Sequence, residues 1–401
     1  MFSKKQKKNN ENRCFLKKVL RALFGCFSFF YVRLLNLFIC KNKVVFLCFG
    51  GKQYGDNLSP ISDMLHERCP KLKLIYLLKD INNKSKDIPD YIKCVKLTRL
   101  SLLTQLATSK VWVDNDHLAT GKRIHKSKKQ LFVETWHGDR GLKKCFYDVE
   151  GFCSERGLAT EIPGYVDYFL VGSKFAEKVV RTMFRYDGKY LKCGYPRNDI
   201  IFNASEQQKT NIRERLGVDA NSKIVLYAPT FKENSENKEE IDFGELIDLL
   251  ETKDGENWVL VLRGHHLTSN ENKEGLKKAN CKIVDGTSGF DMSELLCVAD
   301  MLITDYSSCY GDFILTGKPA ILYVNDLDQY SNFDRGLHFK LEETPFMFVK
   351  NNLELQSLVE KLTPGLAKDN CKKVYDFYGC YENGTATAQV CDLIIDFVKR
   401  K

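Results

Sequence analysis

The feature of this chain that most limits its fold is a repeated alternation between short apolar runs and longer helical stretches. The apolar runs are continuous, so they lack the alternating pattern of a strand that has one face in water. Continuous runs are typical of parallel strands that helices cover on both faces. One series of runs lies between residues 43 and 194, and a second lies between residues 224 and 324. We therefore predict an α/β protein with two doubly wound, Rossmann-like domains facing a central cleft.

The predicted strands divide the chain into three parts. Strands of the first series are expected at Lys43–Phe49, Leu74–Leu78, Val111–Asp114, Leu131–Thr135, Tyr168–Val171 and Leu191–Gly194. Strands of the second series are expected at Ile224–Tyr227, Trp258–Leu262, Lys282–Val284, Met301–Thr304 and Ala320–Val324. We assign residues 1–42 to a leader, 43–202 to an N-terminal domain, and 203–401 to a C-terminal domain with terminal helices.

Helical stretches alternate with these strands. They are predicted at Ser173–Phe184, Phe243–Glu251, Met292–Ala299, Tyr310–Leu315, Leu353–Leu362 and Gln389–Val398, with an interdomain helix in the polar interval Phe202–Leu216. Asp291 and Glu294 give one of these helices a start of the capping-box type. Because ligands of open α/β sheets bind beyond the carboxyl ends of the strands, the cleft between the domains is the expected active site.

The charge of the chain is concentrated at its N-terminus. Residues 1–45 hold eleven basic residues against one acid, a net charge of +10, whereas residues 46–401 carry −1. A nucleic-acid-binding protein normally spreads its basic charge over a folded face. The nearly neutral body therefore argues against a nucleic-acid partner. The content of 43% hydrophobic residues excludes wholesale disorder.

Residues 14–40 form an apolar stretch rich in Phe and Leu. Its longest charge-free part, Ala22–Val32, has eleven residues, fewer than the roughly 20 that a spanning helix needs. No cleavage site of small residues follows it, as a secretory signal requires. We predict that residues 1–42 form a basic amphipathic helix on an anionic membrane surface, which makes the protein peripheral at the cytoplasmic face of the membrane. The alternative is an ordinary first helix that packs on the core.

The fifteen cysteines form no recognisable framework. No pair has C-x-x-C spacing, and several lie in apolar runs, where a thiol behaves as a small hydrophobe. Reduced thiols in a cytosolic compartment are therefore expected. The sequence also lacks GxGxxG, GxxxxGK[ST] and HExxH motifs and has no carboxylate cluster, so we predict no cofactor and no metal.

Two polar clusters follow predicted strands, one in each domain. Thr135-Trp136-His137-Gly138-Asp139 comes directly after the run LFVE. A histidine at this place, beside a glycine that allows close backbone approach, suits a general base. The alternative is a histidine that only packs against the neighbouring tryptophan. In the second domain, Thr230 and Lys232 place a hydroxyl and a cation after a strand, although strand termination alone also accounts for the Pro and Thr found there.

Two further clusters suit an anionic substrate. Arg263-Gly264-His265-His266 follows WVLVL, and both Arg and His donate to phosphate oxygens. Neighbours on an extended chain point to opposite sides, so at most one of these histidines is expected in the site and a metal pair is disfavoured. Thr304-Asp305-Tyr306-Ser307-Ser308 stands between the strand MLIT and a helix, where hydroxyls and N–H groups form an anion cradle. The alternative is that Ser307 or Ser308 only caps the helix.

These clusters belong to a longer set of motifs. They are GKQYGDN (51–57), TWHGD with the following Lys143 and Lys144, GYPRND (194–199), YAPTFK (227–232), RGHH (263–266), ADMLITDYSSCYGDFILTGKPAILY (299–323) and NFDRG (332–336). In this order the sequence resembles the CDP-glycerol glycerophosphotransferase family, the teichoic-acid primases and polymerases of the GT-B fold. The resemblance implies transfer of a polyol phosphate from CDP-glycerol or CDP-ribitol to a hydroxyl of a lipid-linked saccharide or polymer acceptor, with release of CMP.

The resemblance also implies that the N-terminal domain, 43–202, is the acceptor side and that the C-terminal domain, 203–401, binds the CDP donor. It implies roles for individual residues as well. His137 matches the histidine of TWHG, implied as the base, and His265 matches the histidine of R-x-H-P, implied to act at the donor pyrophosphate with Arg263. Donor binding is implied for residues in the YAPT and D-Y-S-S motifs, namely Thr230, Lys232, Thr304, Asp305, Ser307, Ser308 and Asp312. Further cleft residues are expected among Asn57, Asp139, Gly194, Arg197 and Asp199.

Three positions depart from the family pattern. His266 replaces the usual proline, Phe231-Lys232 stands where Trp-Arg is common, and Gly311 replaces Phe before Asp312. Lysine keeps the charge of arginine but loses its bidentate fork. The donor polyol therefore stays open between glycerol and ribitol. Two other functions also stay open: a nucleotide-sugar glycosyltransferase of the same fold, and an inactive membrane-bound scaffold subunit.

Overall fold

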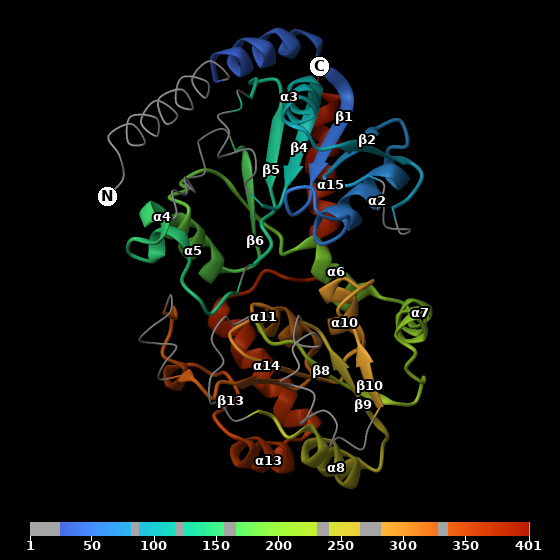
Figure 1. Cartoon of the computed structure of the whole chain (residues 1–401), viewed down its shortest axis with the longest axis vertical. Coiled ribbons are helices and arrows are strands. Elements are labelled where there is room, and N and C mark those ends of the chain that lie inside the picture. The colour runs from blue at the N-terminus through green and yellow to red at the C-terminus, as the bar shows by residue number, and fades with distance from the viewer. Residues whose placement is uncertain are drawn as a thin grey trace, which may run out of the picture.

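The computed structural model describes residues 25–81, 88–116, 124, 126–138, 140–155, 166–230, 240–264, 282–327 and 336–400. It consists of two α/β halves, one above the other in Figure 1, with α6 (Asp199–Asn203) at their junction. Each half contains one sheet, and every strand pair in both sheets is parallel. This architecture confirms the predicted class of two doubly wound domains.

The first half is built on a seven-stranded sheet with the order β3-β2-β1-β4-β5-β6-β7. Its strands are β1 (Cys40–Leu47), β2 (Lys73–Leu78), β3 (Ile92–Lys96), β4 (Ser109–Asp114), β5 (Leu131–Glu134), β6 (Tyr168–Val171) and β7 (Tyr190–Lys192). Its helices are η1 (Asn36–Phe38), α2 (Leu58–Arg68), α3 (Arg99–Thr108), η3 (Phe146–Asp148), α4 (Phe152–Glu155), α5 (Lys174–Met183) and η4 (Pro196–Asn198). Six of the seven strands overlap the predicted runs, and the edge strand β3 does not.

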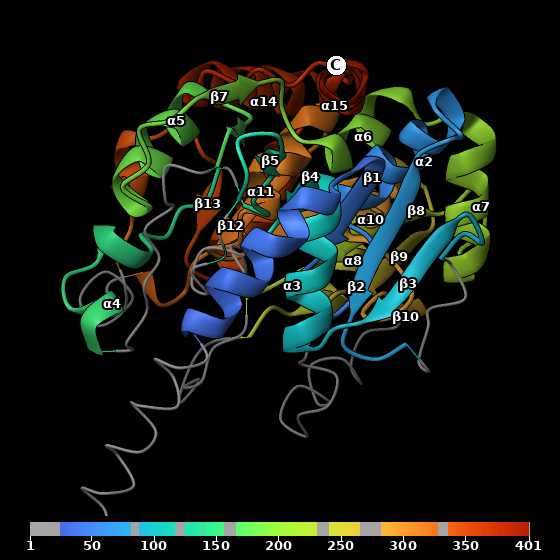
Figure 2. The same cartoon turned by 90° about the horizontal axis from the view of Figure 1, so that it is seen from above.

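Both faces of this sheet are buried, as the continuous apolar runs predict. Along β1, Val44 and Phe46 pack with α2 on one face, while Val45 and Leu47 pack with α3 on the other. Figure 2 shows helices on the two sides of the sheet. Since successive residues of a strand point to opposite faces, a strand covered on both sides has to be apolar at every position.

The second half repeats the topology with the order β10-β9-β8-β11-β12-β13. Its strands are β8 (Lys223–Tyr227), β9 (Trp258–Leu262), β10 (Lys282–Asp285), β11 (Met301–Thr304), β12 (Ala320–Tyr323) and β13 (Phe348–Val349). Its helices are α7 (Glu206–Leu216), α8 (Phe243–Asp254), α10 (Met292–Val298), α11 (Cys309–Phe313), η7 (Ile314–Thr316), η8 (Leu341–Glu343), α13 (Asn352–Lys361) and α14 (Pro364–Tyr378). Glu294 accepts the Asp291 N–H at 2.9 Å at the start of α10, as its spacing predicts.

The end of the chain returns to the first half. α14 lies in the second half, and α15 (Ala386–Lys399) crosses back to lie along the first sheet (Figure 1). Val390 and Ile394 of α15 are fully buried in the cluster that contains Val44 and Phe46 of β1. Part of the range 203–401, which the sequence analysis assigns to the C-terminal domain, therefore completes the core of the N-terminal half.

Residues 25–35 form a helix that lies beside α3 at the end of the first half farthest from the second half (Figure 1). Val32 is buried, and the Tyr31 hydroxyl is 2.9 Å from Thr104 Oγ1 of α3. Within the described residues, no helix combines the length and apolar character needed to cross a membrane.

Candidate active site

Three of the loops that carry the predicted clusters meet between the two halves, because the loop of His137 contacts Thr230 through Lys143 and approaches Ser308 at Gly138. In each sheet the strand order reverses at one place, between β1 and β4 in the first half and between β8 and β11 in the second. A crevice opens at the carboxyl ends of the strands on either side of such a reversal, and ligands of doubly wound proteins bind there. Phe49 and Asn115 follow the two strands of the first half, and Thr230 and Asp305 follow those of the second.

His137 stands just beyond the end of β5, and its imidazole has a defined hydrogen bond. Its Nδ1 lies 2.6 Å from the backbone carbonyl oxygen of Asn115, at the end of the neighbouring strand β4. A carbonyl oxygen only accepts, so Nδ1 carries the proton and Nε2 carries the lone pair. The ring packs against Trp136 and Phe49, with centroid distances of 3.8 and 5.1 Å.

The surroundings of His137 favour its neutral form. Burial lowers the pKa of the imidazole below its ordinary value of 6.5, and the charge of Arg197 acts in the same direction. The hydrogen bond to Asn115 and the charges of Asp56 and Asp116 oppose this effect without overcoming it. The imidazole is therefore neutral at pH 7, the state that a general base requires.

The backbone around His137 is strained. Phe49, Asp56 and Trp136 have φ angles of 42°, 54° and 53°, in the left-handed region that residues with a Cβ rarely adopt. Side chains hold this conformation in place. Asn57 Nδ2 donates to the Trp136 carbonyl at 2.9 Å, and the Trp136 N–H donates to Glu134 Oε1 at 3.0 Å. Strain of this kind, held by buried hydrogen bonds, is a common property of active sites.

In the second half, Thr230 and Asp305 form a connected pair. The Asp305 carboxylate accepts the Thr230 N–H at 2.9 Å and the Thr230 hydroxyl at 2.7 Å. Lys143, from the loop after His137, reaches across and donates to Thr230 Oγ1 at 3.0 Å. Thr304, by contrast, is buried at the end of β11 and donates to the Ala228 carbonyl, so it fastens β11 to the end of β8.

Ser307 and Ser308 lie beside the loop of His137. A Cβ placed on Gly138 would be 3.8 Å from Ser308 Oγ, so the two loops are in contact at this glycine. The Ser307 hydroxyl accepts the Cys309 N–H at 3.4 Å, a long hydrogen bond at the start of α11. Both serines are half-buried, and they bring hydroxyls from the second half next to the histidine loop of the first.

Arg263 is half-buried beyond the end of β9. Its Nη1 donates to the carbonyl oxygens of Gly286 and Thr287 at 2.7 and 2.8 Å, which fixes the guanidinium against the loop after β10. Burial lowers the pKa of Arg263, while the charges of Asp291, Asp285 and Glu294 raise it. The group remains a cation at any physiological pH.

A second contact between the halves joins α10 to the loop after β1. Asp291 Oδ2 accepts the Asp56 N–H at 3.2 Å, and a Cβ on Gly55 would lie 2.6 Å from Asp291 Oδ1. Gly55 has a φ of 143°, so this position needs glycine both for its backbone and for the approach of the carboxylate. Burial, together with the charges of Asp56 and Glu294, raises the pKa of Asp291 to about 6.

Several residues expected in the cleft lie instead in the buried contact between the halves. Asp312 is 5% exposed, and its carboxylate accepts hydrogen bonds from Arg140, Arg197 and Asn198. Gly194 has a φ of 87°, and a Cβ there would lie 2.7 Å from Glu382 Oε2. The turn that begins at Gly194 thus fits closely against Glu382, in the segment before α15.

Two more of the expected cleft residues have structural partners. The Asp199 carboxylate accepts the N–H groups of Ala386 and Thr387 at 3.1 and 2.7 Å, at the start of α15. Asn57 is fully buried and connects the Trp136 carbonyl to the Arg197 N–H. Asp139, Lys232, His265 and His266 lie outside the described residues.

Sequence reasoning did not single out Asn115, Glu134, Arg140, Asp291 or Glu382 as site residues. Asn115 directly follows a predicted strand, and this is the same signal that identified the other clusters. Glu134 is fully buried, and burial raises its pKa well above the ordinary value. Arg140 and Glu382 are 242 residues apart, and no local pattern points to their contact. Among the described residues, no three His, Cys, Asp or Glu side chains are grouped as metal ligands.

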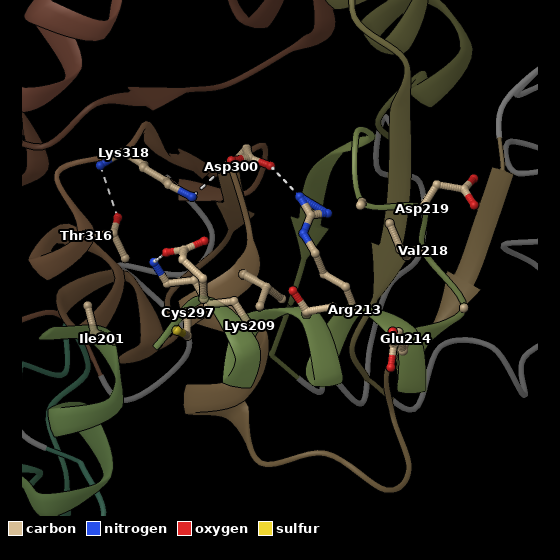
Figure 3. Close-up of a pocket in the computed structure, with 15 residues that line it drawn as sticks. Ile201, Lys209, Arg213, Glu214, Val218, Asp219, Cys297, Asp300, Thr316 and Lys318 are labelled. Atoms are coloured by element: carbon tan, nitrogen blue, oxygen red, sulfur yellow. Dashed lines mark hydrogen bonds and ion pairs between the residues drawn. The ribbon is translucent and has the colours of Figure 1, made fainter. Parts of the chain in front are cut away.

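A pocket of about 850 Å³ lies elsewhere in the second half, between α7, α10 and the loop before β12 (Figure 3). Its cations are already paired. Lys318 Nζ and Arg213 Nη2 lie 2.9 and 3.6 Å from the carboxylate of Asp300, and Lys209 pairs with Glu206 at 2.8 Å. The pocket offers no group suited to the chemistry of the predicted motifs.

The two doubly wound halves that face one another define a fold of the GT-B type. A family model described as CDP-Glycerol:Poly(glycerophosphate) glycerophosphotransferase matches residues 29–396. The chain belongs to this family.

Curated relatives and solved structures agree with this assignment. The chain is 30% identical to the teichoic acid poly(glycerol phosphate) polymerase of Bacillus spizizenii over 372 residues, covering 88% of this chain and 92% of that protein. It is 24% identical to the teichoic acid ribitol-phosphate primase of the same species, covering 96% and 98%. It spans about half of the related polymerases of Staphylococcus epidermidis and Bacillus subtilis, 51% and 48% of their lengths. A variant of the wall teichoic acid polymerase TagF has the same fold, with a TM-score of 0.78, 24% identity and 99% coverage of both chains.

Proposed function

We propose that this protein transfers a polyol phosphate from a CDP-activated donor to a hydroxyl of a membrane-linked saccharide or polymer, and releases CMP. Membership of the glycerophosphotransferase family supports the type of reaction. The meeting of the two sheets' carboxyl ends supports the place where it occurs. Relatives named for glycerol phosphate and for ribitol phosphate both align over most of this chain, so either polyol fits the proposal.

His137 is the general base in this mechanism. The observation that carries the assignment is the 2.6 Å hydrogen bond between Nδ1 and the Asn115 carbonyl, because it leaves Nε2 unprotonated. The acceptor hydroxyl attacks the phosphorus that bears the polyol, and Nε2 takes the hydroxyl proton as the new O–P bond forms. The bond from this phosphorus to the bridging oxygen breaks at the same time, and its electron pair leaves with CMP. General-base assistance typically contributes about 10²–10⁴-fold to such a step.

The second half holds the donor. Arg263, Ser307 and Ser308 supply one cation and two hydroxyls, and the resemblance adds His265 and Lys232. Phosphoryl transfer depends mostly on positioning and on charge stabilisation, so donors of this kind suit the phosphates of a cytidine diphosphate ester. Thr230 is held by Asp305, and Lys143 offsets the negative charge of that carboxylate.

In this proposal, a further group of residues holds the two halves in place and does not contact the substrates. The group consists of Asn57, Gly194, Arg197, Asp199 and Asp312. The hydrogen bonds of Asp312 to three partners in the buried contact favour a supporting role over direct contact with the donor. Thr304 acts in the same way, because its hydroxyl fastens β11 to the strand that leads to Thr230.

The helix 25–35 and η1 attach the protein to the inner face of the membrane. Exposed apolar side chains gather on these two elements, with exposed fractions of 53% for Phe27, 68% for Phe30, 59% for Leu34, 76% for Leu37 and 67% for Phe38. Tyr31, Val32 and Leu35 face the protein core instead. A helix that buries one side in the protein and exposes a second apolar side suits insertion at the boundary of the acyl chains. The eleven basic residues in 1–45 add attraction to anionic head groups.

A donor screen tests the proposed reaction. The purified protein is incubated with a lipid-linked saccharide acceptor and CDP-glycerol, CDP-ribitol or a sugar nucleotide, and the released nucleotide and the acceptor mass are measured. The proposal predicts CMP release and a mass increase of one or more polyol phosphates with a CDP-polyol. Transfer from the sugar nucleotide alone would identify a glycosyltransferase. Absence of transfer from every donor would favour a scaffold without activity.

A further inference from the structure

Arg140 is a fully buried cation only three residues beyond His137. None of its side chain is exposed, and Nη2 donates to Asp312 Oδ1 at 2.6 Å and to Glu382 Oε1 at 2.9 Å. Asp312 lies on α11 of the second half, and Glu382 lies in the segment that leads back to α15. One guanidinium therefore fastens the histidine loop to two other parts of the chain. A buried ion pair of this kind is costly to form. Removal of one partner strongly destabilises the protein, because the other charge then stays buried without compensation.

The partners of Arg140 form a cluster of charged and polar side chains. Arg197 Nη2 donates to Asp312 Oδ2 at 3.1 Å, and Asn198 Nδ2 donates to Asp312 and Glu382 at 3.0 Å each. Arg197 Nη1 also lies 3.7 Å from Asp56 Oδ1, so two guanidinium groups face three carboxylates. Burial alone would raise the pKa of Asp312, but the charges of Arg197 and Arg140 outweigh it and lower the pKa. Asp312 is therefore ionised at neutral pH, and its hydrogen bonds to Arg140, Arg197 and Asn198 bind both halves together.

Gly311 leaves the space through which Arg140 passes. A Cβ on Gly311 would lie 2.4 Å from Arg140 Cβ and 3.1 Å from Arg140 Nε. Contacts below 3.0 Å are not tolerated, and the nearest atom is the first carbon of the side chain, which cannot swing aside. The glycine and the buried arginine therefore form a matched pair.

The contact lies close to the reacting groups. Arg140 is three residues after His137, and Asp312 is four residues after Ser308. Gly138 lies between His137 and Arg140, and its Cβ position is 3.8 Å from Ser308 Oγ, so the two segments are in contact there. A shift of the arginine would therefore move the base relative to the serines beside it.

We propose that Arg140 is a positioning residue that sets the distance between the His137 base and the donor-binding start of α11, with Gly311 as its required partner. The proposal rests on the proposed transfer reaction. Arg140 acts through the loop and not by touching the substrate. Misplacement of reacting groups by about 1 Å costs on the order of 100-fold in rate, so changes at Arg140 should act on kcat.

A double-mutant cycle tests the pairing. Gly311→Ala alone should lower kcat for CMP release by on the order of 100-fold, because the new methyl group displaces Arg140. Arg140→Gly removes the carbon that this methyl group would meet. The double variant should therefore be no slower than Arg140→Gly alone. Losses that multiply in the double variant would show that the two residues act independently and would overturn the pairing.

The role in positioning needs a readout that a general loss of stability would not move. The kcat of Arg140→Lys should be at least tenfold higher than the kcat of Arg140→Met. The KM for the CDP-polyol should change less than threefold in both variants. Amide hydrogen exchange of Arg140→Met should increase at the histidine loop and α11 and stay unchanged in β1 and β8. Arg140→Lys keeps the test available if Arg140→Met does not fold.

Arg213→Met is the matched control. Arg213 is also an arginine that pairs with a half-buried carboxylate, that of Asp300. Both residues lie within the second half and outside the contact between the halves. This variant should keep the wild-type kcat. Near-wild-type kcat in Arg140→Met, or an equal loss in Arg213→Met, would overturn the proposal. If the wild-type protein transferred no polyol phosphate at all, the proposed reaction would fail instead, and hydrogen exchange would still report on the contact.

Discussion

At the scale of single residues, the proposed site centres on a histidine that the Asn115 carbonyl holds in one tautomer beside strained backbone. Left-handed backbone at a non-glycine residue costs of order 1–3 kcal/mol, and Phe49, Asp56 and Trp136 all adopt it beside His137. Buried polar groups offset this cost, among them Glu134, which accepts the Trp136 N–H. The result is an imidazole whose hydrogen bond and protonation state are set before any substrate arrives.

The pH dependence of the reaction should report this protonation state. The base is active only when neutral, so lowering the pH through its pKa removes activity. Because burial lowers the pKa of His137 below 6.5, the acid limb of kcat/KM should have its midpoint below that value, and the rate should be level near pH 7. CMP release measured from pH 5 to 8 checks this.

His66→Ala is a suitable control for the pH profile. His66 stacks on Tyr91 at a centroid distance of 3.8 Å, on α2 and not in the His137 loop. Its loss should leave the acid limb where it is. A midpoint at pH 7 or above in the wild-type protein would contradict the proposed environment of His137.

At the scale of elements, the strands could be predicted well because burial on both faces makes them continuously apolar. Tyr168–Val171, Trp258–Leu262 and Met301–Thr304 are the same residues in the sequence prediction and in the structure. The edge strand β3 was missed, since it is largely exposed and carries lysines, and β13 has only two residues. The polar clusters of the His137 loop and Ser307 could also be predicted, because each of them directly follows a strand in the sequence.

Contacts between distant segments could not be predicted in this way. The Arg140–Glu382 pair, the return of α15 and the approach of Asp291 to Asp56 depend on how the two halves meet. Nothing in the spacing around these residues encodes a partner that lies hundreds of positions away. Prediction from a single sequence therefore pointed to the loop that carries the proposed base, and it did not reveal the distant contacts that fix the position of this loop.

The exposed apolar side of the first helix leads to a prediction at the same scale. Changing Phe30, Leu34 and Leu37 together to Ser should abolish sedimentation with anionic phosphatidylglycerol vesicles, because the inserting surface is lost. Binding of the wild-type protein to neutral phosphatidylcholine vesicles should be weaker, since the basic leader then has no anionic partner.

Leu353→Ser provides the matched control for this experiment. Leu353 is 78% exposed on α13 of the second half, so it is as accessible as the changed residues without lying on the first helix. It should sediment like the wild-type protein. Full vesicle binding by the triple variant would show that the helix 25–35 does not attach the protein.

At the scale of the whole molecule, several contacts hold the two halves together, and two of them involve carboxylates that are buried or half-buried. One is the ion cluster around Asp312, and the other is the carboxylate of Asp291 against the Asp56 N–H. In addition, the chain passes from α14 in the second half to α15, which packs in the core of the first half. These features favour a cleft with a fixed spacing between base and donor site.

The Asp291 contact should make stability depend on pH. The folded-state pKa of about 6 lies above the ordinary 3.8, so the folded protein binds a proton that the unfolded chain has released. The resulting stabilisation is present at low pH and is lost as pH rises through 6. Between pH 5 and 7 the wild-type protein should lose roughly 1 kcal/mol relative to Asp291→Asn.

Urea unfolding of both proteins at the two pH values measures this difference. Asp291→Asn also changes the hydrogen bond to Asp56, but that effect does not vary with pH and is removed by the comparison. A constant difference between the two proteins, or one that grows in favour of the wild type at pH 7, would contradict the raised pKa.

The measurement that tests the central claim most directly is CMP release by His137→Ala beside CDP-polyol binding by the same variant. Removal of the base should reduce turnover of the accepted CDP-polyol by at least about 100-fold, while calorimetry should find donor affinity within a few fold of wild type. Near-normal CMP release by His137→Ala would remove this histidine from the chemistry and contradict the account of the site.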